Sequence, residues 1–244
     1  MGDFAGKRIW IIGASSGIGA ALARAFADEG AQLILSARDE AALNRQAEEC
    51  GGAKVIAFDL GQSGALADAI TRLDPEPLDA VLCTAAMYEP SRIADIDPAV
   101  AEQLVRINLL GMIEVGRLCP KLLRDGGQLV LFGSVAGYIG LRGGQPYSAT
   151  KAAVNNLAET LAAELSPKID VRLVCPGFVR SRLTDKNDFK MPAIISAEEA
   201  AGHVLRGMKG RAFEIHFPKR FTLAVKLLRL LPYSLSLRLT RRFG

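Results

Sequence analysis

The chain has 244 residues, half of them hydrophobic, which is enough to bury a sizeable core in one or two domains. Its four cysteines (Cys50, Cys83, Cys119 and Cys175) form no CxxC pair and only two histidines accompany them, so we expect reduced thiols in a cytoplasmic protein and no metal site. The formal net charge is +4, and we expect neither a signal peptide nor a membrane span, because no apolar run is long enough.

Short apolar runs alternate with amphipathic segments along most of the chain. The runs cover residues 8–13, 31–37, 53–58, 79–86, 127–134, 169–177 and 211–217. Runs of this kind are typical of strands buried on both faces of a parallel sheet, and the segments between them repeat apolar residues as helices do. The alternation predicts right-handed βαβ units in a single domain over residues 1–217, followed by a C-terminal helical extension over residues 218–244.

A glycine-rich loop follows the first predicted strand. In the sequence GASSGIG, Gly13, Gly17 and Gly19 allow a tight turn and a close approach of the backbone to a pyrophosphate. The helix that begins there offers free N–H groups, and Ser15 and Ser16 can add hydroxyl donors. Because the loop lies inside the first βαβ unit, it predicts dinucleotide binding.

The end of the second strand bears on the choice of cofactor. An acidic residue there would bind the ribose 2′-hydroxyl of NAD, but the sequence reads SAR at 36–38, with no acid before Asp39. The guanidinium of Arg38 can pair with a 2′-phosphate, so we expect NADP(H) rather than NAD(H). Alternatively, Arg38 only begins a solvated helix. Asp59, which precedes Leu60 at the end of the third strand, can bind an adenine edge or cap the next segment.

Tyr147 and Lys151 lie four residues apart, which places them on one face of a helix. A tyrosine hydroxyl has an ordinary pKa of about 10 and is a poor base, but a nearby ammonium lowers that pKa and allows proton transfer. Such pairs are usually surface pairs on ordinary helices. Ser134 distinguishes this one, because it lies at the carboxyl end of the fifth strand, where parallel sheets hold their ligands.

Together with Asn108 in INLLG and the PG at 176–177, these motifs resemble those of the short-chain dehydrogenase/reductase family over roughly residues 6–215. The resemblance implies a Rossmann-like, doubly wound α/β fold with a seven-stranded parallel sheet in a three-layer α/β/α arrangement. It also implies hydride transfer between a nicotinamide cofactor and a carbonyl or alcohol.

The resemblance assigns roles to four residues. Tyr147 would be the acid/base, and Lys151 would lower its pKa and hold the nicotinamide ribose. Ser134 would orient the substrate oxygen, and Asn108 would support a water relay. From the residues alone, Asn108 is only a polar residue inside a helix.

The implied cofactor surface comprises Gly13, Ser15, Ser16, Gly17, Ile18, Gly19, Arg38, Asp59, Leu60, Thr84, Ala85, Ala86, Tyr147, Lys151, Pro176, Gly177, Val179 and Ser181. The sequence departs from the family where Asn-Asn-Ala-Gly usually follows the fourth strand and CTAA stands at 83–86. Thr84 can replace some hydrogen bonds, so we expect altered cofactor packing without loss of activity. Ser181 or Thr184 would contact the carboxamide, and we prefer Ser181.

Residues 180–196 form a connection of a length that is typical of a binding lid. Its apolar side chains can line a pocket or anchor the loop. The candidate pocket walls are Tyr138, Ile139, Leu141 and Arg142, and a large apolar or aromatic carbonyl compound is the favoured substrate. The candidate substrate-binding residues are Ser134, Tyr138, Tyr147 and Phe178.

Residues 219–244 contain seven Lys/Arg and no Asp or Glu, which leaves 23 basic and 26 acidic residues in the rest of the chain. The segment predicts a basic amphipathic helix that Pro232 interrupts. It can pack on its own protein or a second subunit, or it can lie on the inner face of an anionic membrane. Nucleic-acid binding is not expected, because no recognition motif accompanies the charge.

The sequence therefore predicts an NADP(H)-dependent ketone or aldehyde reductase for an apolar substrate. The resemblance also implies a homodimer or homotetramer that forms through the helices carrying Asn108 and Tyr147. One alternative is a non-catalytic NADP-binding sensor or scaffold on the same fold. Another is a nucleotide-sugar epimerase or dehydratase, but such enzymes usually need a larger C-terminal substrate domain than residues 219–244 provide.

Overall fold

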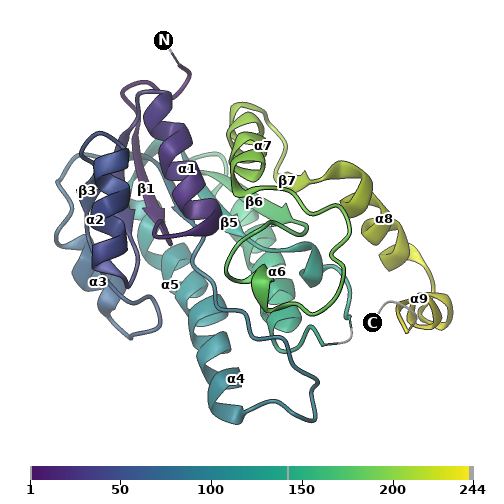
Figure 1. Ribbon diagram of the computed structural model, residues 1–244. Coiled ribbons are helices and arrows are strands. Elements are labelled where there is room, and N and C mark those ends of the chain that lie inside the picture. The colour runs from purple at the N-terminus through teal and green to yellow at the C-terminus, as the bar shows by residue number, and fades with distance from the viewer. Residues whose placement is uncertain (1, 142, 242–244) are drawn as a thin grey trace.

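A computed structural model describes residues 2–141 and 143–241, so the candidate pocket residue Arg142 lies outside the described residues. The chain forms one seven-stranded sheet in the order β3-β2-β1-β4-β5-β6-β7, and every neighbouring pair is parallel (Figure 1). The strands are β1 (Arg8–Ile12), β2 (Gln32–Ser36), β3 (Lys54–Val55), β4 (Leu78–Cys83), β5 (Leu123–Phe132), β6 (Asp170–Pro176) and β7 (Glu214–Phe217). Each predicted run overlaps one of them; β4 begins one residue and β5 four residues before its run.

The third strand is shorter than its apolar run at 53–58. Only Lys54 and Val55 pair with β2 as a ladder, although the N–H groups of Ile56 and Phe58 still donate to carbonyls of the neighbouring segment. β3 is an edge strand, so only one neighbouring strand stabilises its extended conformation.

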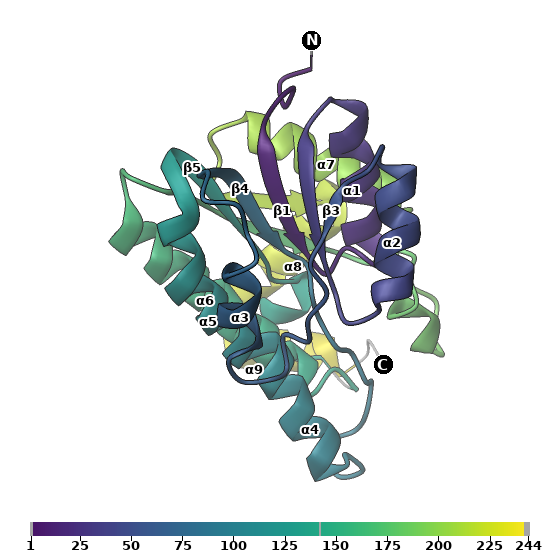
Figure 2. The same cartoon turned by 90° about the vertical axis from the view of Figure 1, so that its left-hand side faces the viewer.

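Helices cover both faces of the sheet, as Figure 2 shows. One face carries α1 (Gly17–Asp28), α2 (Glu40–Glu49) and α7 (Ala197–Lys209). The other carries α3 (Ala65–Ile70), α5 (Gly111–Leu118) and α6 (Tyr147–Leu165), with α4 (Pro98–Val105) leading into α5. Side chains of β1 alternate between the two cores: Ile9 and Ile11 face the first, and Trp10 and Ile12 the second. The three-layer α/β/α fold with a seven-stranded parallel sheet, which the family resemblance implied, is confirmed.

Four short helices connect the main elements. A π-helix (Arg106–Leu110) joins α4 to α5, and 3₁₀ turns occupy Cys119–Leu122, Val135–Gly137 and Thr184–Lys186. The turn at Val135–Gly137 directly follows β5, so it begins at the carboxyl edge of the sheet, where the predicted reaction residues are expected.

The C-terminal extension forms α8 (Lys219–Leu230) and α9 (Tyr233–Thr240), which Pro232 separates as predicted. Within α8, Thr222 is fully buried and shares a hydrogen bond with His216 of β7 (Oγ1 to Nδ1, 2.6 Å), and Lys226 forms an ion pair with Glu214. Phe221 and Val225 pack against the core. The inner side of α8 therefore docks on the sheet, while α8 and α9 extend beyond β7 (Figure 1).

No helix within residues 2–141 and 143–241 combines the length and apolar character that crossing a bilayer requires.

Candidate active site

The glycine loop after β1 is packed so closely that only glycine fits at two positions. A Cβ on Gly19 would lie 2.1 Å from the carbonyl oxygen of Gly13, and a Cβ on Gly13 would lie 2.5 Å from the backbone nitrogen of Ala85. Gly13 and Gly17 also have positive φ angles, +100° and +56°, which favour glycine. The loop is therefore a narrow backbone cradle at the start of α1.

Thr84 closes this cradle from the end of β4. Its Oγ1 lies 3.0 Å from the carbonyl oxygen of Gly13 and 3.2 Å from that of Ile12, within reach for hydrogen bonds. The backbone N–H groups of Thr84 and Ala85 donate to the same Ile12 oxygen, at 2.8 and 3.1 Å. Thr84 thus makes side-chain hydrogen bonds, as expected from sequence, and these bonds hold the glycine loop.

The start of α1 can accept an anion. Ser16 is the N-cap residue, but its side chain makes no capping hydrogen bond, and the first turn contains no acidic residue. Free N–H groups beside closely packed glycines fit a pyrophosphate. The residues present therefore fit a dinucleotide cofactor.

The polar residues around the end of β2 have different tasks. Ser36 accepts a buried hydrogen bond from Trp10 Nε1 (2.9 Å), and Asp39 caps α2 by accepting from the N–H of Ala42 (2.9 Å). Arg38 is exposed and makes no ion pair within the part of the chain that the structure describes. Its guanidinium is therefore free to meet a phosphate at this edge.

The segment after β3 is held by its own residues. Asp59 Oδ1 accepts from the N–H of Gly61 (2.8 Å), which is the capping role weighed for it from sequence. The side chain of Leu60 is buried against Gly111, where an added Cβ would lie 2.7 Å from Leu60 Cγ. Leu60 thus belongs to the core with its side chain, and only its backbone can face a cofactor.

The structure brings Ser134, Tyr147 and Lys151 together beyond the end of β5. Ser134 caps the following turn, with its Oγ accepting from the N–H of Ala136 (3.1 Å), and Tyr147 is the first residue of α6. Lys151 is only 2% exposed, and its Nζ donates to the carbonyl oxygen of Phe132 (2.7 Å), 5.7 Å from the centre of the Tyr147 ring.

Burial dominates the electrostatics of this group. It raises the pKa of Tyr147 to about 12, although a hydrogen bond with Ser134 acts in the opposite direction. It lowers the pKa of Lys151 to about 8. The lowered pKa expected for Tyr147 is therefore not found, because desolvation of the phenolate outweighs the hydrogen bond with Ser134, and the Lys151 ammonium donates to the Phe132 carbonyl.

Asn108 is fully buried within the π-helix. Its Oδ1 accepts from the N–H of Met87 (2.7 Å), its Nδ2 donates to the Met87 carbonyl (2.8 Å), and Thr150 Oγ1 lies 3.3 Å away. π-Helical turns often occur at functional sites. Asn108 therefore ties the segment after β4 to α6, a contact that sequence reasoning did not identify.

Tyr88 is a residue near the site that sequence reasoning missed. Its ring packs edge-on against Tyr147, with 4.9 Å between the ring centres, and its hydroxyl donates to Asn187 Oδ1 (2.7 Å) in the 180–196 connection. An aromatic residue shortly after the carboxyl end of β4 was the available signal. Tyr88 links the reaction residues to the candidate lid.

Tyr138, which the sequence predicts to bind substrate, already has partners for its hydroxyl and its ring. The Tyr138 hydroxyl donates to Glu214, and Lys226 lies 5.4 Å from the centre of its ring. Burial raises the pKa of this tyrosine. Because β7 and α8 supply these partners, the hydroxyl lies in the contact with the C-terminal extension.

Phe178 lies between the candidate lid and the extension. Its ring centre is 5.8 Å from that of Phe189 and 5.7 Å from that of Phe221. The sequence left open whether Phe189 lines a pocket or anchors the loop, and these contacts favour anchoring. Phe178 is partly buried by this stack, beyond the end of β6.

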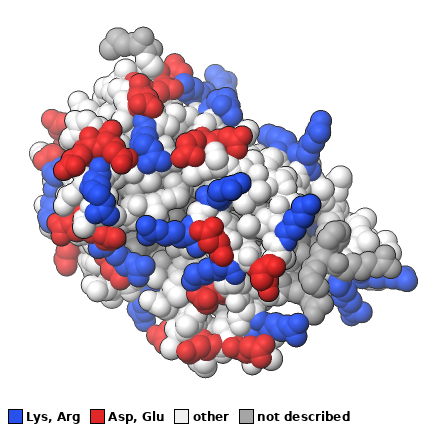
Figure 3. Space-filling view, in the orientation of Figure 1, with Lys and Arg blue, Asp and Glu red and all other residues white. Residues whose placement is uncertain are grey.

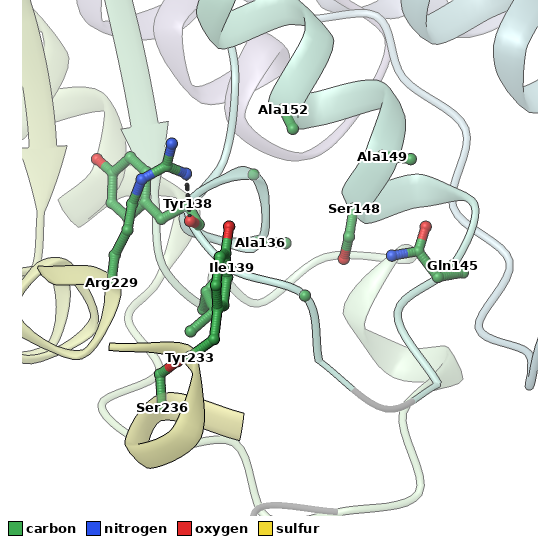
Figure 4. Close-up of a pocket in the computed structure, with 12 residues that line it drawn as sticks. Ala136, Tyr138, Ile139, Gln145, Ser148, Ala149, Ala152, Arg229, Tyr233 and Ser236 are labelled. Atoms are coloured by element: carbon green, nitrogen blue, oxygen red, sulfur yellow. Dashed lines mark hydrogen bonds between the residues drawn. The ribbon is translucent and has the colours of Figure 1, made fainter. Parts of the chain in front are cut away.

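A hollow of about 310 Å³ lies between α6, the turn after Ser134 and the two C-terminal helices (Figure 4). Within the described residues its lining omits Ser134 and Tyr147, so it opens on another side of α6 from the reaction residues. The lining residues are Ala136, Gly137, Tyr138, Ile139, Gly140, Gln145, Ser148, Ala149, Ala152, Arg229, Tyr233 and Ser236.

Among the described residues there is no cluster of three or more His, Cys, Asp or Glu that could hold a metal ion.

Comparison with known proteins places this geometry in a family. The family model for short chain dehydrogenases matches residues 7–191. An uncharacterized oxidoreductase of Myxococcus xanthus is 28% identical over 96% of each chain. The L-fucose dehydrogenase of Oryctolagus cuniculus is 33% identical over 71% of this chain and 63% of its own length, and 11-beta-hydroxysteroid dehydrogenase A of Sesamum indicum is 33% identical over 75% and 55%.

Solved structures share the fold. A short-chain dehydrogenase from Sphingobium yanoikuyae in complex with NADPH has a TM-score of 0.78 at 28% identity, covering 87% of this chain and 88% of its own. A short chain dehydrogenase/reductase from Burkholderia phymatum in complex with NAD has a TM-score of 0.82 at 24% identity, covering 93% and 94%. Because the Burkholderia protein is only 24% identical, its similarity supports the fold and nothing further.

The close packing of Gly19 generates a prediction. Gly19→Ala should weaken the binding of NADPH and of NADH by about tenfold or more, because the added methyl group forces the cradle open. For the same reason it should lower the free energy of unfolding by about 1–3 kcal/mol. Fluorescence titration and urea unfolding measure the two effects. Gly140→Ala is the matched control, since nothing lies within 4 Å of its added Cβ. Equal behaviour of the two variants would contradict the prediction.

Proposed function

The chain belongs to the short-chain dehydrogenase family, and we propose that it is an NADP(H)-dependent reductase of apolar ketones or aldehydes. Its membership of this family makes it an oxidoreductase, and we propose in addition its preference for NADP(H) and its class of substrate. The observation that carries the proposal is the joint position of Ser134, Tyr147 and buried Lys151 beyond the end of β5.

The cofactor would lie along the carboxyl edge of the sheet. The glycine cradle and the start of α1 would hold its pyrophosphate, and Arg38 its 2′-phosphate. At the other end, the Thr184 hydroxyl is bonded to Val179 and Ser181 backbone groups (both 2.9 Å). A Cβ on Gly17 would lie 3.4 Å from Ser181 Cβ, which supports Ser181 rather than Thr184 as the carboxamide contact.

The remaining proposed cofactor contacts follow the family pattern at Ser15, Ser16, Ile18, Asp59, Leu60, Thr84, Ala85, Ala86, Tyr147, Lys151, Pro176, Gly177 and Val179. When bound, reduced nicotinamide supplies a hydride to the carbonyl carbon. The Sphingobium relative that binds NADPH supports this choice of cofactor.

The protein's own residues would handle the substrate oxygen. Tyr147 would donate its hydroxyl proton to that oxygen, and Ser134 would hold the same oxygen through a hydrogen bond. A tyrosine whose pKa burial raises to about 12 keeps its proton at neutral pH, so it is a ready acid and a poor base. This favours reduction. Asn108 would then support the water relay that returns a proton to Tyr147.

Aromatic side chains around the reaction residues support an apolar substrate. Tyr88 packs on Tyr147, and the half-exposed Phe189 of the 180–196 connection packs on Phe178. The relatives do not distinguish between substrate classes, because one is named for a sugar and another for a steroid. NADPH oxidation across a panel of ketones, aldehydes and quinones would test the proposal, and a preference for small polar ketones would contradict it.

Assembly would use the helices next to the site. Val105, Leu110 and Ile113 expose apolar side chains along α4 to α5, and Ala149 and Ala152 are exposed on α6. These patches support a homodimer or homotetramer through these helices. Four free cysteines, three of them buried, agree with a cytoplasmic protein.

The lowered pKa of Lys151 gives an expected pH dependence. Below pH about 8 its ammonium is charged and can hold the nicotinamide ribose; above that pH the charge is lost. For reduction, kcat/KM should therefore fall as pH rises through about 8, because this parameter reports pKa values of the free enzyme. Tyr147, with a pKa of about 12, should not contribute to this limb. A constant kcat/KM up to about pH 10 would contradict the assignment.

Tyr147→Phe tests the proton donor. The variant should keep NADPH affinity within about twofold and lose about 10²–10⁴-fold in kcat, the usual contribution of general acid catalysis. Tyr233→Phe is the matched control, because Tyr233 is exposed on α9. Steady-state rates with the best substrate of the panel provide the measurement. An unchanged kcat in Tyr147→Phe would refute the mechanism.

Arg38→Ala tests the preference for NADP. Removal of one charge-assisted contact should raise the Kd of NADPH by about 10–100-fold and leave that of NADH within about twofold. Arg45→Ala, also exposed and on α2, controls for a general loss of positive charge. Equal losses for both cofactors would exclude Arg38 from binding the 2′-phosphate.

A further inference from the structure

The C-terminal helices present an apolar surface that no described residue covers. Its side chains have exposed fractions between 37% and 82%. We propose that this surface docks on an anionic lipid bilayer, which would make the protein a peripheral membrane protein. We call it the leucine surface, and it consists of Leu223, Leu227, Leu230, Leu231, Tyr233, Leu235, Leu237 and Leu239.

The surface is held in place by the opposite side of α8. Thr222 is fully buried against His216, Lys226 pairs with Glu214, and Arg229 donates to the carbonyl oxygen of Tyr138 (Figure 4). Because these contacts use the inner side of the helix, its leucines on the outer side remain in solvent. A fixed surface loses little conformational entropy when it docks.

Charge identifies the partner. The described residues 218–241 contain six Lys/Arg and no Asp or Glu, whereas the chain before Lys219 has 23 basic and 26 acidic residues. Figure 3 shows blue but no red side chains where α8 and α9 lie, at the right of the view. An anionic bilayer attracts such a segment, and each Lys/Arg near the lipid surface contributes about 1 kcal/mol. The acidic remainder of the chain would face away from the lipid.

The dimensions favour lying on the bilayer over crossing it. α8 has 12 residues and α9 has 8, so the longer helix spans about 18 Å at 1.5 Å per residue. The hydrocarbon core is about 30 Å thick. Exposed leucines beside exposed basic residues such as Arg220 and Arg238 are the pattern of an interfacial helix.

A second copy of the chain fits this surface less well. Two leucine surfaces in contact would bring two acid-free basic segments together, and like charges repel. Of the six basic residues, Lys226 has a carboxylate partner in Glu214 on its own chain. Lipid phosphate supplies the missing negative charge, and the acyl region accepts the leucines.

Vesicle co-sedimentation of the full chain tests the proposal. Vesicles of phosphatidylcholine mixed with phosphatidylglycerol should bind the wild type, and vesicles of phosphatidylcholine alone should bind it much more weakly. The double variant Leu227→Gln, Leu230→Gln should lose about tenfold or more in partition coefficient, because these two side chains are 65% and 79% exposed. Ile93→Gln is the matched control, since Ile93 is 72% exposed on a loop outside the leucine surface.

The charge variant Arg220→Gln, Arg238→Gln should weaken binding to the anionic vesicles and reduce its sensitivity to salt. Thermal unfolding and NADPH affinity of all variants should match the wild type, which excludes misfolding. Equal partitioning of wild type and the leucine variant, or no binding by the wild type, would overturn the proposal. If light scattering instead found that the leucine variant dissociates a wild-type oligomer while vesicles bind neither protein, the surface would belong to an interface between copies.

Discussion

Every strand of the sheet runs in the same direction, and the rest of the molecule depends on that constraint. Parallel strands end at one edge, so segments far apart in the chain converge there. The glycine cradle follows β1, Thr84 follows β4, and Ser134 follows β5. Thr84 then locks the cradle by hydrogen bonds across neighbouring strands, and α6 returns Tyr147 and Lys151 to the same edge. The parallel arrangement of the strands therefore determines both the core and the place where the site residues meet.

The packing that positions the reaction residues also buries Lys151 and partly buries Ser134 and Tyr147. Desolvation favours the uncharged form of both groups: it raises the pKa of Tyr147 and lowers that of Lys151. At neutral pH Tyr147 therefore keeps its proton, and Lys151, with a pKa of about 8, stays largely charged. This state suits proton donation to a carbonyl better than proton removal from an alcohol. The local electrostatics thus support the proposed direction, reduction, for which the sequence offered only the inferred preference for NADP.

The sequence predicted the strands well, because each strand is a short apolar run bounded by turn residues. It also predicted the glycine cradle and the grouping of Ser134, Tyr147 and Lys151, since their spacing repeats a known pattern. It did not predict the contact of Tyr138 with Glu214, which lies 76 positions along the chain, because no local pattern signals such a contact. The expected direction of the Tyr147 pKa shift was wrong, because burial is a property of the assembled core. Tyr88 was missed for the same reason: its two partners come from different segments.

The contact of Tyr138 with Glu214 and Lys226 has a consequence for the way this chain can diverge. The three side chains come from the turn after β5, from β7 and from α8, and each satisfies the others. Loss of the Lys226 ammonium would leave the half-buried Glu214 carboxylate without its cation, and loss of the carboxylate would leave the Tyr138 hydroxyl unsatisfied. Natural substitutions at these positions should therefore occur together. In an alignment of relatives that keep the C-terminal helices, the three columns should covary, although their nearest members are 12 positions apart.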